Sequence, residues 1–531
     1  MPDAPTPTRT LGEALISLLE AHGVELVFGI PGVHTVELYR GLARSSIRHV
    51  TPRHEQGAGF MADGYARASG KAGVAFVITG PGLLNTLTAM GQARADSVPM
   101  LVISGVNARD TLGKGLGHLH EMPDQRGLTA KLALRSTRIE SPADLPQALD
   151  EAFRIFSSER PGPVHIEIPT DVMALPVGDL RPVLDGAAKP TADPALIEQA
   201  AALLGGARRP LILAGGGAKA AERELRRLAE ALDAPVVATT NARGLLHAHP
   251  LLVPAAPSLA PVRQLMAEAD AVLAVGTEFG PTDYDMYGDN GFRVPENLVR
   301  IDIDAEQLGR HPGRIDIKAD SAQALEALVA AVPRGGGREG AARARTTTQA
   351  ARAALSPLLA GQLKAVEAIR DALPNSIIVG DSTQTIYAAN LFYDHDRPGG
   401  WFNAATGFGA LGFGAPAAVG AALGQPDVPV VCLTGDGGLQ FVLAELGAAL
   451  EAAAPVVFVV WNNRGYREIE TSMRDAGVEP VGVSPVPPDF TLIAKAYGMT
   501  AERIEGAEGI GEAVKRARAV GRAALVEVMV A

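Results

Sequence analysis

The sequence is poor in cysteine and aromatic residues, and it has no long apolar run. Among its 531 residues is a single cysteine, Cys432, which lies inside an apolar segment. One cysteine excludes internal disulfides and clusters of thiolate metal ligands, and it is typical of a protein of the reducing cytoplasm. We expect Cys432 to be a small buried hydrophobe rather than a reactive thiol.

The sequence also lacks the features of membrane and nucleic-acid partners. No apolar run approaches the roughly 18 residues that a membrane helix requires, and the N-terminal stretch "MPDAPTPTRT" has no signal-peptide core. The formal net charge is −11, and no block of Lys and Arg stands out. A cytoplasmic protein with neither membrane nor nucleic-acid partner is therefore predicted.

Apolar β-branched runs alternate with stretches rich in Ala, Leu and Glu along nearly the whole chain. Runs such as "GVAFVIT", "PLILAGG" and "PVVFVVW" are typical of parallel strands buried on both faces. Two segments of different composition, near residues 180–194 and at residues 333–349, are expected to be linkers, the second of them mobile. We predict an α/β protein with parallel sheets covered by helices on both faces, in three domains that span residues 1–180, 190–335 and 355–531.

Two of the apolar runs end on polar residues. The stretch "VVCLTGDGGLQF", residues 430–441, places Asp436 between glycines, and "PVVFVVWNN" ends on Asn462 and Asn463. Asn463 follows Asp436 by 27 residues, about one helix (residues 439–454) and one strand. In an open parallel sheet, ligands bind beyond the carboxyl ends of the strands, so both residues are expected at one site.

The residue types around Asp436 fit a metal ion that holds a phosphate group. Gly435, Gly437 and Gly438 let a phosphate approach the backbone closely. A carboxylate, an amide oxygen and a loop carbonyl form the hard oxygen site that suits Mg²⁺.

Gly-Asp-Gly, followed after a helix and a strand by Asn-Asn, resembles the thiamine-diphosphate motif. The resemblance implies that Asp436, Asn463 and the main-chain carbonyl of Gly465 bind Mg²⁺, which in turn binds the diphosphate of thiamine diphosphate. The stretch "GDSTQT", residues 380–385, resembles the loop that contacts the diphosphate. Its candidate residues are Ser382, Thr383 and Gln384.

Further motifs of this family cover the aminopyrimidine ring of the cofactor. The stretch "GFGALGFGAPAAVGAALG" resembles the segment that holds this ring. By resemblance, the Gly409 carbonyl accepts from the 4′-amino group, and Leu411, 25 residues before Asp436, wedges the cofactor into its bent form. The stretch "TGPGLLN" belongs to the N-terminal pattern, with Gly80 as a cofactor-binding candidate.

The N-terminal stretch "RHEQGAGFMADGYAR" resembles the glutamate segment of the acetolactate-synthase-like branch of these enzymes. The resemblance implies that Glu55 hydrogen-bonds N1′ of the aminopyrimidine and so promotes the C2 carbanion. Its small and apolar neighbours favour a buried carboxylate. In this family the glutamate and the metal site meet across a subunit interface, so a homodimer or homotetramer is expected.

The family resemblance implies decarboxylation of a 2-oxo acid by the C2 carbanion, which leaves an enamine. The enamine is either protonated to an aldehyde or attacks a second carbonyl. Ser472 stands nine residues after Asn463, where acetolactate synthases carry a tryptophan, and "TTNARGLLHAHP" is not followed by their flavin-contacting Gly-Met-His-Gly. These departures argue against the alternative, an acetolactate-synthase-type carboligase, and against bound FAD, without excluding either.

Several acidic residues are candidates for substrate contacts. Glu468 and Glu470, in "NNRGYREIE", stand where related enzymes place substrate-facing side chains. Glu468 is either the shifted equivalent of a catalytic glutamate, a ligand for the substrate tail, or part of a solvated rim. Asp283 and Asp285 in "GTEFGPTDYDMY" are expected at the channel mouth, with no arginine beside them. An acidic mouth favours a guanidinium tail.

The stretch "LGKGLGHLHEMPDQR" contains His118 and His120, which either transfer protons to the enamine or cap the loop. Together with "NNRGYREIE" it resembles the 5-guanidino-2-oxopentanoate (2-ketoarginine) decarboxylases of this branch. We favour such a decarboxylase, with another large-tailed 2-oxo acid as the broader possibility. A protein that binds the cofactor without turnover is disfavoured, because Glu55, Asp436 and Asn463 are all present.

Overall fold

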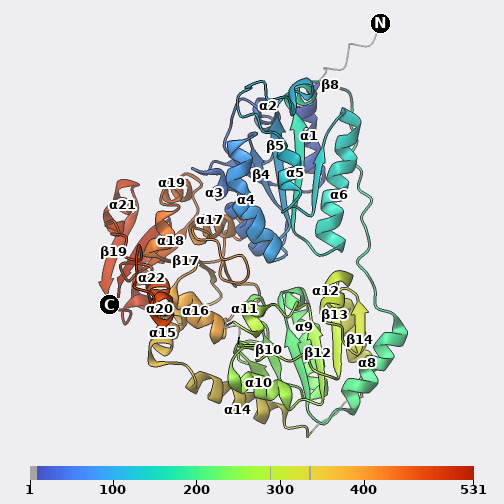
Figure 1. Ribbon diagram of the computed structural model, residues 1–531, viewed down its shortest axis with the longest axis vertical. Coiled ribbons are helices and arrows are strands. Elements are labelled where there is room, and N and C mark those ends of the chain that lie inside the picture. Colours follow the sequence, from blue (N-terminus) through green and yellow to red (C-terminus); the bar gives the residue numbers. More distant parts are fainter. Residues whose placement is uncertain (1–8, 287–288, 334–336, 531) are drawn as a thin grey trace.

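The computed structural model describes residues 9–286, 289–333 and 337–530. These residues form three six-stranded sheets, each of which is parallel throughout. Each sheet lies in its own part of the molecule, with helices packed around it (Figure 1). The predicted α/β class is confirmed. A two-stranded antiparallel sheet, β1 (Arg9–Thr10) with β8 (Pro176–Val177), closes the N-terminal part.

The strands are short, apolar and buried. The N-terminal sheet has the order β3-β2-β4-β5-β7-β6, with β2 (Leu26–Gly29), β3 (Arg48–Val50), β4 (Gly73–Val77), β5 (Met100–Val106), β6 (Arg135–Arg138) and β7 (Pro163–Pro169). The central sheet has the order β11-β10-β9-β12-β13-β14, with β9 (Pro210–Ala214), β10 (Val236–Ala238), β11 (Leu252–Val253), β12 (Ala271–Val275), β13 (Leu298–Asp302) and β14 (Ile315–Lys318). The C-terminal sheet has the order β16-β15-β17-β18-β20-β19, with β15 (Ile377–Gly380), β16 (Trp401–Asn403), β17 (Val430–Gly435), β18 (Val456–Asn462), β19 (Thr500–Glu505) and β20 (Ala524–Met529).

Helices connect these strands. The first part of the chain contains α1 (Leu11–Ala21), α2 (Val36–Leu42), α3 (Glu55–Ser69), α4 (Pro81–Ala95), α5 (Gln125–Thr129), α6 (Leu145–Ser158) and α7 (Thr170–Met173). The central part contains α8 (Pro194–Gly206), α9 (Glu222–Leu232), α10 (Ala260–Ala267), α11 (Pro281–Tyr284), α12 (Ala305–Arg310) and α13 (Ser321–Ala331). The last part contains α14 (Gly340–Ala353), α15 (Pro357–Ala372), α16 (Gln384–Leu391), α17 (Gly414–Gly424), α18 (Asp436–Gln440), α19 (Glu445–Glu451), α20 (Arg467–Asp475), α21 (Phe490–Ala496) and α22 (Ile510–Ala519).

The N-terminal and C-terminal sheets have the same topology. Numbered from its own first long strand, each runs in the order 2-1-3-4-6-5. In the N-terminal sheet, β3 is added on one side of β2 and β4 on the other; in the C-terminal sheet, β16 and β17 flank β15 in the same way. The order of the strands therefore reverses between β2 and β4, and between β15 and β17. Open α/β sheets bind ligands outside the carboxyl ends of the strands at such a switch point. Asp381 follows β15 and Asp436 follows β17, so both stand at the switch point of the C-terminal sheet.

Both faces of the C-terminal sheet are buried, in two different apolar clusters. Along β17, Cys432 faces the cluster that also contains residues of α3 and α17, whereas Val431 and Leu433 face the cluster of α15 and α22. Cys432 is fully buried, as predicted for a small hydrophobe, and burial raises the pKa of its thiol. The first cluster joins the N-terminal and C-terminal parts of the molecule into one core.

Helices α3 and α17 cross with their backbones in close contact. A Cβ atom on Gly64 of α3 would lie 1.9 Å from the Ala417 carbonyl oxygen, and a Cβ on Gly420 of α17 would lie 1.9 Å from that of Met61. Both positions therefore require glycine, because any side chain would push the helices apart. This crossing fixes the helix that begins with Glu55 against the C-terminal sheet.

Two expectations from the sequence are wrong. The segment at residues 333–349 is not a linker throughout, because α14 begins at Gly340 and buries Ala344. The Gly and Arg content suggested mobility, but Arg343 donates to the Pro210 carbonyl at 3.1 Å and so attaches this segment to the central part. Residues 334–336 lie outside the described ranges, and the domain boundaries stay predictions.

The single helix expected at residues 439–454 is also wrong, because two short helices, α18 and α19, occupy this stretch. The turn between them tightens: the N–H groups of Phe441 and Val442 donate to carbonyls three residues earlier, at 3.2 and 3.0 Å.

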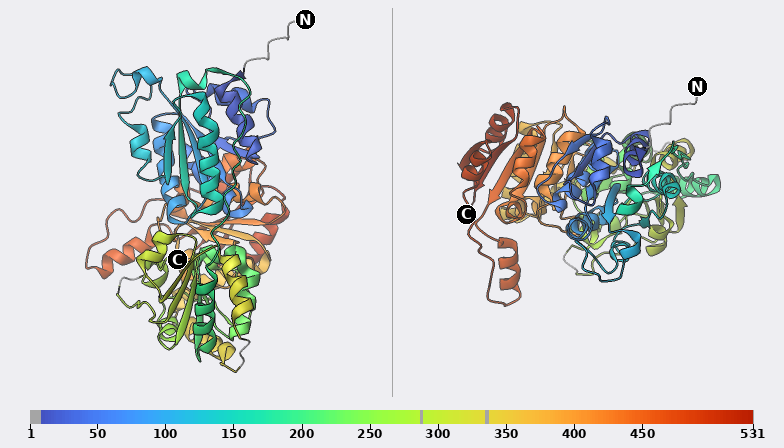
Figure 2. Two further views of the ribbon diagram at one scale, coloured as in Figure 1. Left: turned by 90° about the vertical axis from the view of Figure 1, so that its right-hand side faces the viewer. Right: turned by 90° about the horizontal axis from the view of Figure 1, so that it is seen from above.

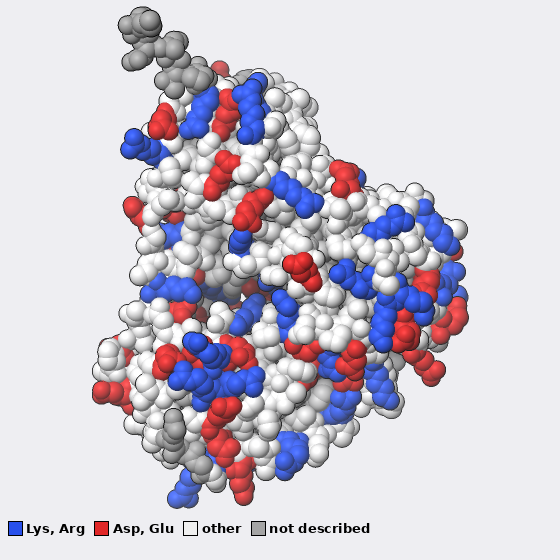
Figure 3. All heavy atoms as spheres, turned by 180° about the vertical axis from the view of Figure 1, so that it is seen from behind, with Lys and Arg blue, Asp and Glu red and all other residues white. Residues whose placement is uncertain are grey.

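The charged surface has no extended region of one sign on the face shown in Figure 3, where blue and red side chains are interspersed. No helix within the described ranges is long and apolar enough to cross a membrane. Helix α20, with no buried residue, projects from the body together with the segment that follows it (Figure 2).

Candidate active site

A cleft of about 400 Å³ lies at the carboxyl ends of β15, β17 and β18. It therefore lies at the switch point of the C-terminal sheet. The predicted site residues that line it are Ser382, Thr383, Gln384, Gly409, Leu411, Gly435, Asp436, Gly437, Gly438, Asn463, Gly465 and Glu468. Tyr387, Tyr466 and Arg467 complete much of its wall.

Three oxygen atoms face one another at the base of this cleft. The Asn463 side-chain oxygen lies 2.8 Å from the Gly465 carbonyl oxygen and 3.2 Å from Asp436 Oδ1. The Asn463 amide nitrogen donates to Gln384 Oε1 at 2.9 Å, and the reverse orientation of the amide would set two oxygens against each other there. In the orientation that donates to Gln384, three acceptor oxygens meet with no hydrogen between them, which favours a cation among them; the reversed amide would instead donate to the Gly465 carbonyl and to Asp436 Oδ1.

Asp436 itself is buried without full compensation. Its side chain is only 2% exposed, and Oδ2 has no hydrogen-bond partner among the described residues. Burial raises the pKa of Asp436, although the backbone N–H groups of Asn463, Gly465 and Gly437 oppose this shift. A bound cation would favour the ionised carboxylate. The residues thus fit a hard divalent ion such as Mg²⁺, bound by oxygen atoms rather than by a cluster of acids and histidines; no such cluster occurs in the part of the chain described.

Two glycines leave room for this arrangement. A Cβ on Gly437 would lie 2.4 Å from the Tyr466 ring. Gly465 has a φ of +153°, and its Cβ would lie 2.6 Å from the Val483 carbonyl oxygen. Both positions therefore favour glycine, because a side chain at either would collide with these neighbours.

Asp381 was not among the residues singled out in the sequence, yet it organises the cleft. Its buried carboxylate accepts the N–H groups of Ser382 at 2.8 Å, Gly412 at 3.2 Å and Gly414 at 3.1 Å. Burial raises its pKa to about 6. The residue connects the loop after β15 to the segment before α17. The available signal was its place in "GDSTQT", directly after a strand, as Asp436 is.

The predicted N-terminal site residues form a separate group. Glu55 is half-buried at the first position of α3, where it accepts from the Asn85 amide at 3.0 Å. Gly80 has a φ of +64°, and its Cβ would lie 2.6 Å from the His120 carbonyl oxygen, so these two residues are neighbours. Neither Glu55, Gly80 nor His120 lines the cleft.

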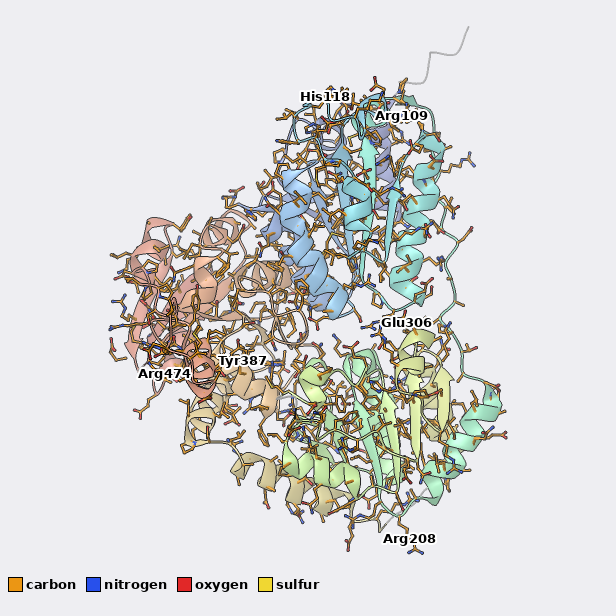
Figure 4. All side chains as sticks on the ribbon, in the orientation of Figure 1. Arg109, His118, Arg208, Glu306, Tyr387 and Arg474 are labelled. Carbon is orange, nitrogen blue, oxygen red and sulfur yellow. The ribbon has the colours of Figure 1, made fainter. Side chains whose placement is uncertain are left out.

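The loop that holds His118 lies at the far end of the N-terminal part. Figure 4 shows His118 well away from Tyr387, which lines the cleft of the same chain. His118 is exposed, and Glu121, not a histidine, caps this loop, since its carboxylate accepts the N–H groups of residues 116–118. The Nδ1 atom of the half-buried His120, in the same loop, has no hydrogen-bond partner among the described residues.

Glu445, also not anticipated, ties α19 to the segment that precedes Glu55. Its carboxylate is 1% exposed and accepts the backbone N–H groups of Arg53 and His54, both at 3.0 Å. Burial raises its pKa to about 7. The contact joins residues almost 400 positions apart, so no local pattern could indicate it.

We expect Glu445→Gln to remove a pH dependence of stability. The folded protein holds a proton on Glu445 up to about pH 7, whereas the unfolded chain releases it near its ordinary pKa of 4.5. The contribution of this group to the free energy of unfolding is therefore full below about pH 4 and falls by the order of 3 kcal/mol as the pH rises to about 7. Thermal midpoints of both proteins at about pH 5 and pH 8 test this. An equal loss of midpoint in the two proteins would contradict the raised pKa.

The acidic residues of α20 differ in their partners. Glu470 is paired with Arg467 at 2.5 Å and with Arg474 at 2.8 Å. Arg474 can be found in Figure 4. Glu468 is exposed, lines the cleft and has no ion-pair partner in the described ranges. Ser472 does not line the cleft, and its hydroxyl donates to the Glu468 carbonyl at 2.9 Å within the helix.

The channel mouth differs from expectation. Asp283 lines a second cleft, of about 430 Å³, and is half-buried; its carboxylate accepts the Thr240 N–H at 2.9 Å. Asp285 lines neither cleft and is paired with Arg263 at 3.1 Å. The expectation that no arginine accompanies these acids is wrong, because Arg263, 22 residues earlier in the chain, folds back onto Asp285. Thr282 and Gly407 border both clefts, so the two are adjacent.

Comparison with known proteins identifies this arrangement. Residues 9–128 match the thiamine pyrophosphate enzyme N-terminal TPP binding domain, residues 197–328 the central domain, and residues 381–528 the C-terminal TPP binding domain. The chain belongs to the thiamine pyrophosphate enzyme family. The predictions of this family and of thiamine diphosphate as the cofactor are confirmed.

Individual thiamine-pyrophosphate enzymes resemble the whole chain. A probable 2-ketoarginine decarboxylase of Pseudomonas aeruginosa is 46% identical over 513 residues, which cover 94% of this chain and 90% of that protein. A probable acetolactate synthase large subunit of Methanococcus aeolicus is 31% identical, with coverage of 95% and 89%. Acetolactate synthase isozyme 1 large subunit of Escherichia coli is 34% identical, with coverage of 86% and 82%. The resemblance to the acetolactate-synthase-like branch is thereby confirmed, and the chain is a thiamine-diphosphate enzyme.

Proposed function

We propose that this enzyme decarboxylates a 2-oxo acid with thiamine diphosphate and Mg²⁺, and that its favoured substrate is 5-guanidino-2-oxopentanoate. The observation that carries the proposal is the set of three facing oxygens at the base of the cleft, in a chain of this family. When bound, thiamine diphosphate supplies the electron sink for decarboxylation. The chain's own residues bind the cofactor, orient it and keep water from the reacting carbon.

In this proposal, Asp436, Asn463 and the Gly465 carbonyl hold Mg²⁺. The diphosphate lies against the glycines after β17 and the loop that starts with Ser382. Gly409 and Leu411, which line the same cleft, contact the aminopyrimidine ring. Support comes from their common place in one cleft of about 400 Å³, large enough for a cofactor of this size.

Glu55 is proposed to hydrogen-bond N1′ of the aminopyrimidine of a cofactor bound by a second copy of the chain. It does not line the cleft of its own chain, and neither does the neighbouring pair Gly80 and His120. Exposed apolar side chains on the same part of the molecule support a subunit contact there. They are Val33 (68% exposed), Val36 (54%), Leu116 (61%) and Leu119 (61%). We therefore propose a homodimer, or a homotetramer built from it.

Glu468 is proposed to bind the guanidinium tail of the substrate. A carboxylate accepts two parallel N–H bonds from a guanidinium, and Glu468 is free for this because Glu470 holds Arg467. The 46% identity to a probable 2-ketoarginine decarboxylase favours the same substrate class. Asp285 is not proposed as a ligand of the guanidinium, because its carboxylate is already paired with Arg263.

Glu468→Gln is expected to raise KM for 5-guanidino-2-oxopentanoate about tenfold and to leave kcat within about threefold. The exposure of the side chain keeps the effect moderate. Carbon dioxide release measured against substrate concentration gives both constants. Glu479→Gln, which neutralises an exposed acid on the segment after α20, is the control and is expected to change neither. A fall in kcat with unchanged KM would instead make Glu468 a catalytic residue.

A second candidate is carboligation of the acetolactate-synthase type, favoured by relatives at 31% and 34% identity. Ser472, where acetolactate synthases carry a tryptophan, argues against carboligation. Because Ser472 does not line the cleft, this objection carries less weight than the sequence alone suggested. The organic product distinguishes the two reactions, since carboligation consumes a second 2-oxo acid for each carbon dioxide released.

FAD is not expected in the purified protein. The central sheet has the order 3-2-1-4-5-6 of dinucleotide-binding folds, with its switch point between β9 and β12. The loops after β9 and β12 pack closely there, since a Cβ on Gly215 would lie 2.2 Å from the Gly276 carbonyl oxygen. The expectation rests on the sequence, in which residues 239–250 are not followed by the flavin-contacting Gly-Met-His-Gly of acetolactate synthases. The absorbance spectrum of the protein, with and without added FAD, tests this expectation. A flavin band that persists through gel filtration would contradict it.

A further inference from the structure

A single buried carboxylate, that of Asp96, connects all three parts of the molecule. Asp96 follows α4 and its side chain is 2% exposed. It accepts from Arg67 Nη2 at 2.8 Å, from the Asn241 amide at 3.1 Å and from the Thr406 hydroxyl at 2.8 Å. These donors come from the N-terminal, central and C-terminal parts respectively. In Figure 1, α4 runs from the N-terminal part toward the other two.

The charge of Asp96 is compensated locally. Arg67, 4% exposed, bridges Asp96 and Asp63, with an Nε to Asp63 distance of 2.6 Å. Its guanidinium also lies over the rings of Phe402 and Phe413, at 5.5 and 5.6 Å from their centroids. Burial would raise the pKa of Asp96, but Arg67 and the hydrogen-bond donors hold it below its ordinary value. Asp96 is therefore an ionised acceptor fixed in one orientation.

This carboxylate holds both ends of the segment that carries Gly409. At one end it accepts directly from Thr406. At the other, the Gln92 side-chain amide nitrogen donates to Asp96 at 2.8 Å, while its side-chain oxygen Oε1 accepts the Ala410 N–H at 3.3 Å. The residues between these anchors, 407–409, are exposed. Besides the two anchors, this segment is held by the Gly409 N–H, which donates to the Ala404 carbonyl at 3.1 Å, and by the Phe408 ring, which lies against Gly91 of α4.

We propose that Asp96 is a positioning residue that fixes residues 406–410 so that Gly409 and Leu411 can hold the aminopyrimidine ring. This inference rests on the proposed function, in which those two residues contact the cofactor. It concerns no atom of the metal site, because neither Thr406 nor Gln92 lies at the base with Asp436. Loss of the anchors is therefore expected to weaken binding of the aminopyrimidine ring and to leave binding of the diphosphate unchanged.

A matched pair of variants tests the proposal. Thr406→Val and Asn241→Ala each remove one neutral donor to the same carboxylate, but only Thr406 belongs to the segment that carries Gly409. Thr406→Val is expected to raise Kd for thiamine diphosphate about fivefold in isothermal titration with Mg²⁺, and Asn241→Ala to change it by less than about twofold. Asp96→Asn, which loses the charge, is expected to raise Kd at least about tenfold.

Magnesium pyrophosphate serves as the second probe. The Kd for magnesium pyrophosphate is expected to stay within about twofold of wild type in all three variants, because pyrophosphate has no aminopyrimidine ring. If Thr406→Val and Asn241→Ala weaken thiamine diphosphate equally, or if pyrophosphate weakens in parallel, Asp96 has only a general structural role and the inference is wrong. If wild type itself fails to bind thiamine diphosphate with Mg²⁺, the proposed function is wrong, and the two failures are thus distinct.

Discussion

Glu55→Gln is expected to lower turnover at least about a thousandfold while thiamine diphosphate remains bound. Glutamine keeps the volume of the side chain, and its oxygen can still accept from the Asn85 amide, which lies 3.0 Å from Glu55 Oε2. The start of α3 is therefore expected to stay intact. In the proposed role, the substitution removes an oxygen that can take up and return a proton at N1′ of the cofactor. Carbon dioxide release gives turnover, and isothermal titration with Mg²⁺ gives cofactor affinity.

Glu13→Gln is the matched control for this prediction. Glu13 is also a half-buried glutamate in the first turn of a helix, and its carboxylate accepts the Thr10 N–H at 2.9 Å, a bond that glutamine can retain. Turnover of Glu13→Gln is expected within about twofold of wild type. Wild-type turnover of Glu55→Gln would show that Glu55 takes no part in the chemistry. Loss of cofactor binding would show that it acts only in binding.

Asp436→Ala is expected to remove the dependence of cofactor binding on Mg²⁺. The Kd for thiamine diphosphate with Mg²⁺ is expected to rise at least about a hundredfold, to the value that wild type shows with a chelator. The remaining oxygens of Asn463 and Gly465 are neutral and bind a divalent ion weakly on their own. Because Asp436 is buried with an unpartnered oxygen, its removal is not expected to lower the thermal midpoint.

Asp150→Ala controls for the loss of a buried carboxylate elsewhere. Asp150, in α6, is 7% exposed and accepts the Asp185 N–H at 3.1 Å. This variant is expected to lose thermal stability and to keep its cofactor affinity, the reverse of Asp436→Ala. If Asp436→Ala binds thiamine diphosphate as wild type does, and still requires Mg²⁺, the oxygen site at the base of the cleft is not the metal site.

The sheets and the main binding residues follow from local patterns in the sequence. Continuous apolar runs such as "VVCLTG" specify strands buried on both faces, and the polar residue after each run stands at the carboxyl edge of the sheet. The spacing between Asp436 and Asn463 therefore predicts their proximity, and the structure brings their oxygens to 3.2 Å. These contacts depend only on the stretch between the two residues, which holds α18, α19 and β18.

The contacts that escaped prediction join distant parts of the chain. Glu445 accepts from Arg53, which lies 392 residues earlier in the chain, and Arg263 folds back onto Asp285, which the sequence alone presents as a free acid. In the sequence, Asp96 is only a polar residue at the end of a helix; the structure adds its hydrogen bonds from Asn241 and Thr406. Burial and long-range partners decide the role of such charged residues, and neither is visible in a local pattern.

Product analysis with two substrates tests the central claim most directly. The protein, with thiamine diphosphate and Mg²⁺, would be incubated separately with 5-guanidino-2-oxopentanoate and with pyruvate, and carbon dioxide and the organic product would be measured. We expect carbon dioxide and 4-guanidinobutanal in equal amounts from the first substrate and little turnover of the second. Acetolactate from pyruvate, with one carbon dioxide for every two pyruvates, would contradict it and identify a carboligase.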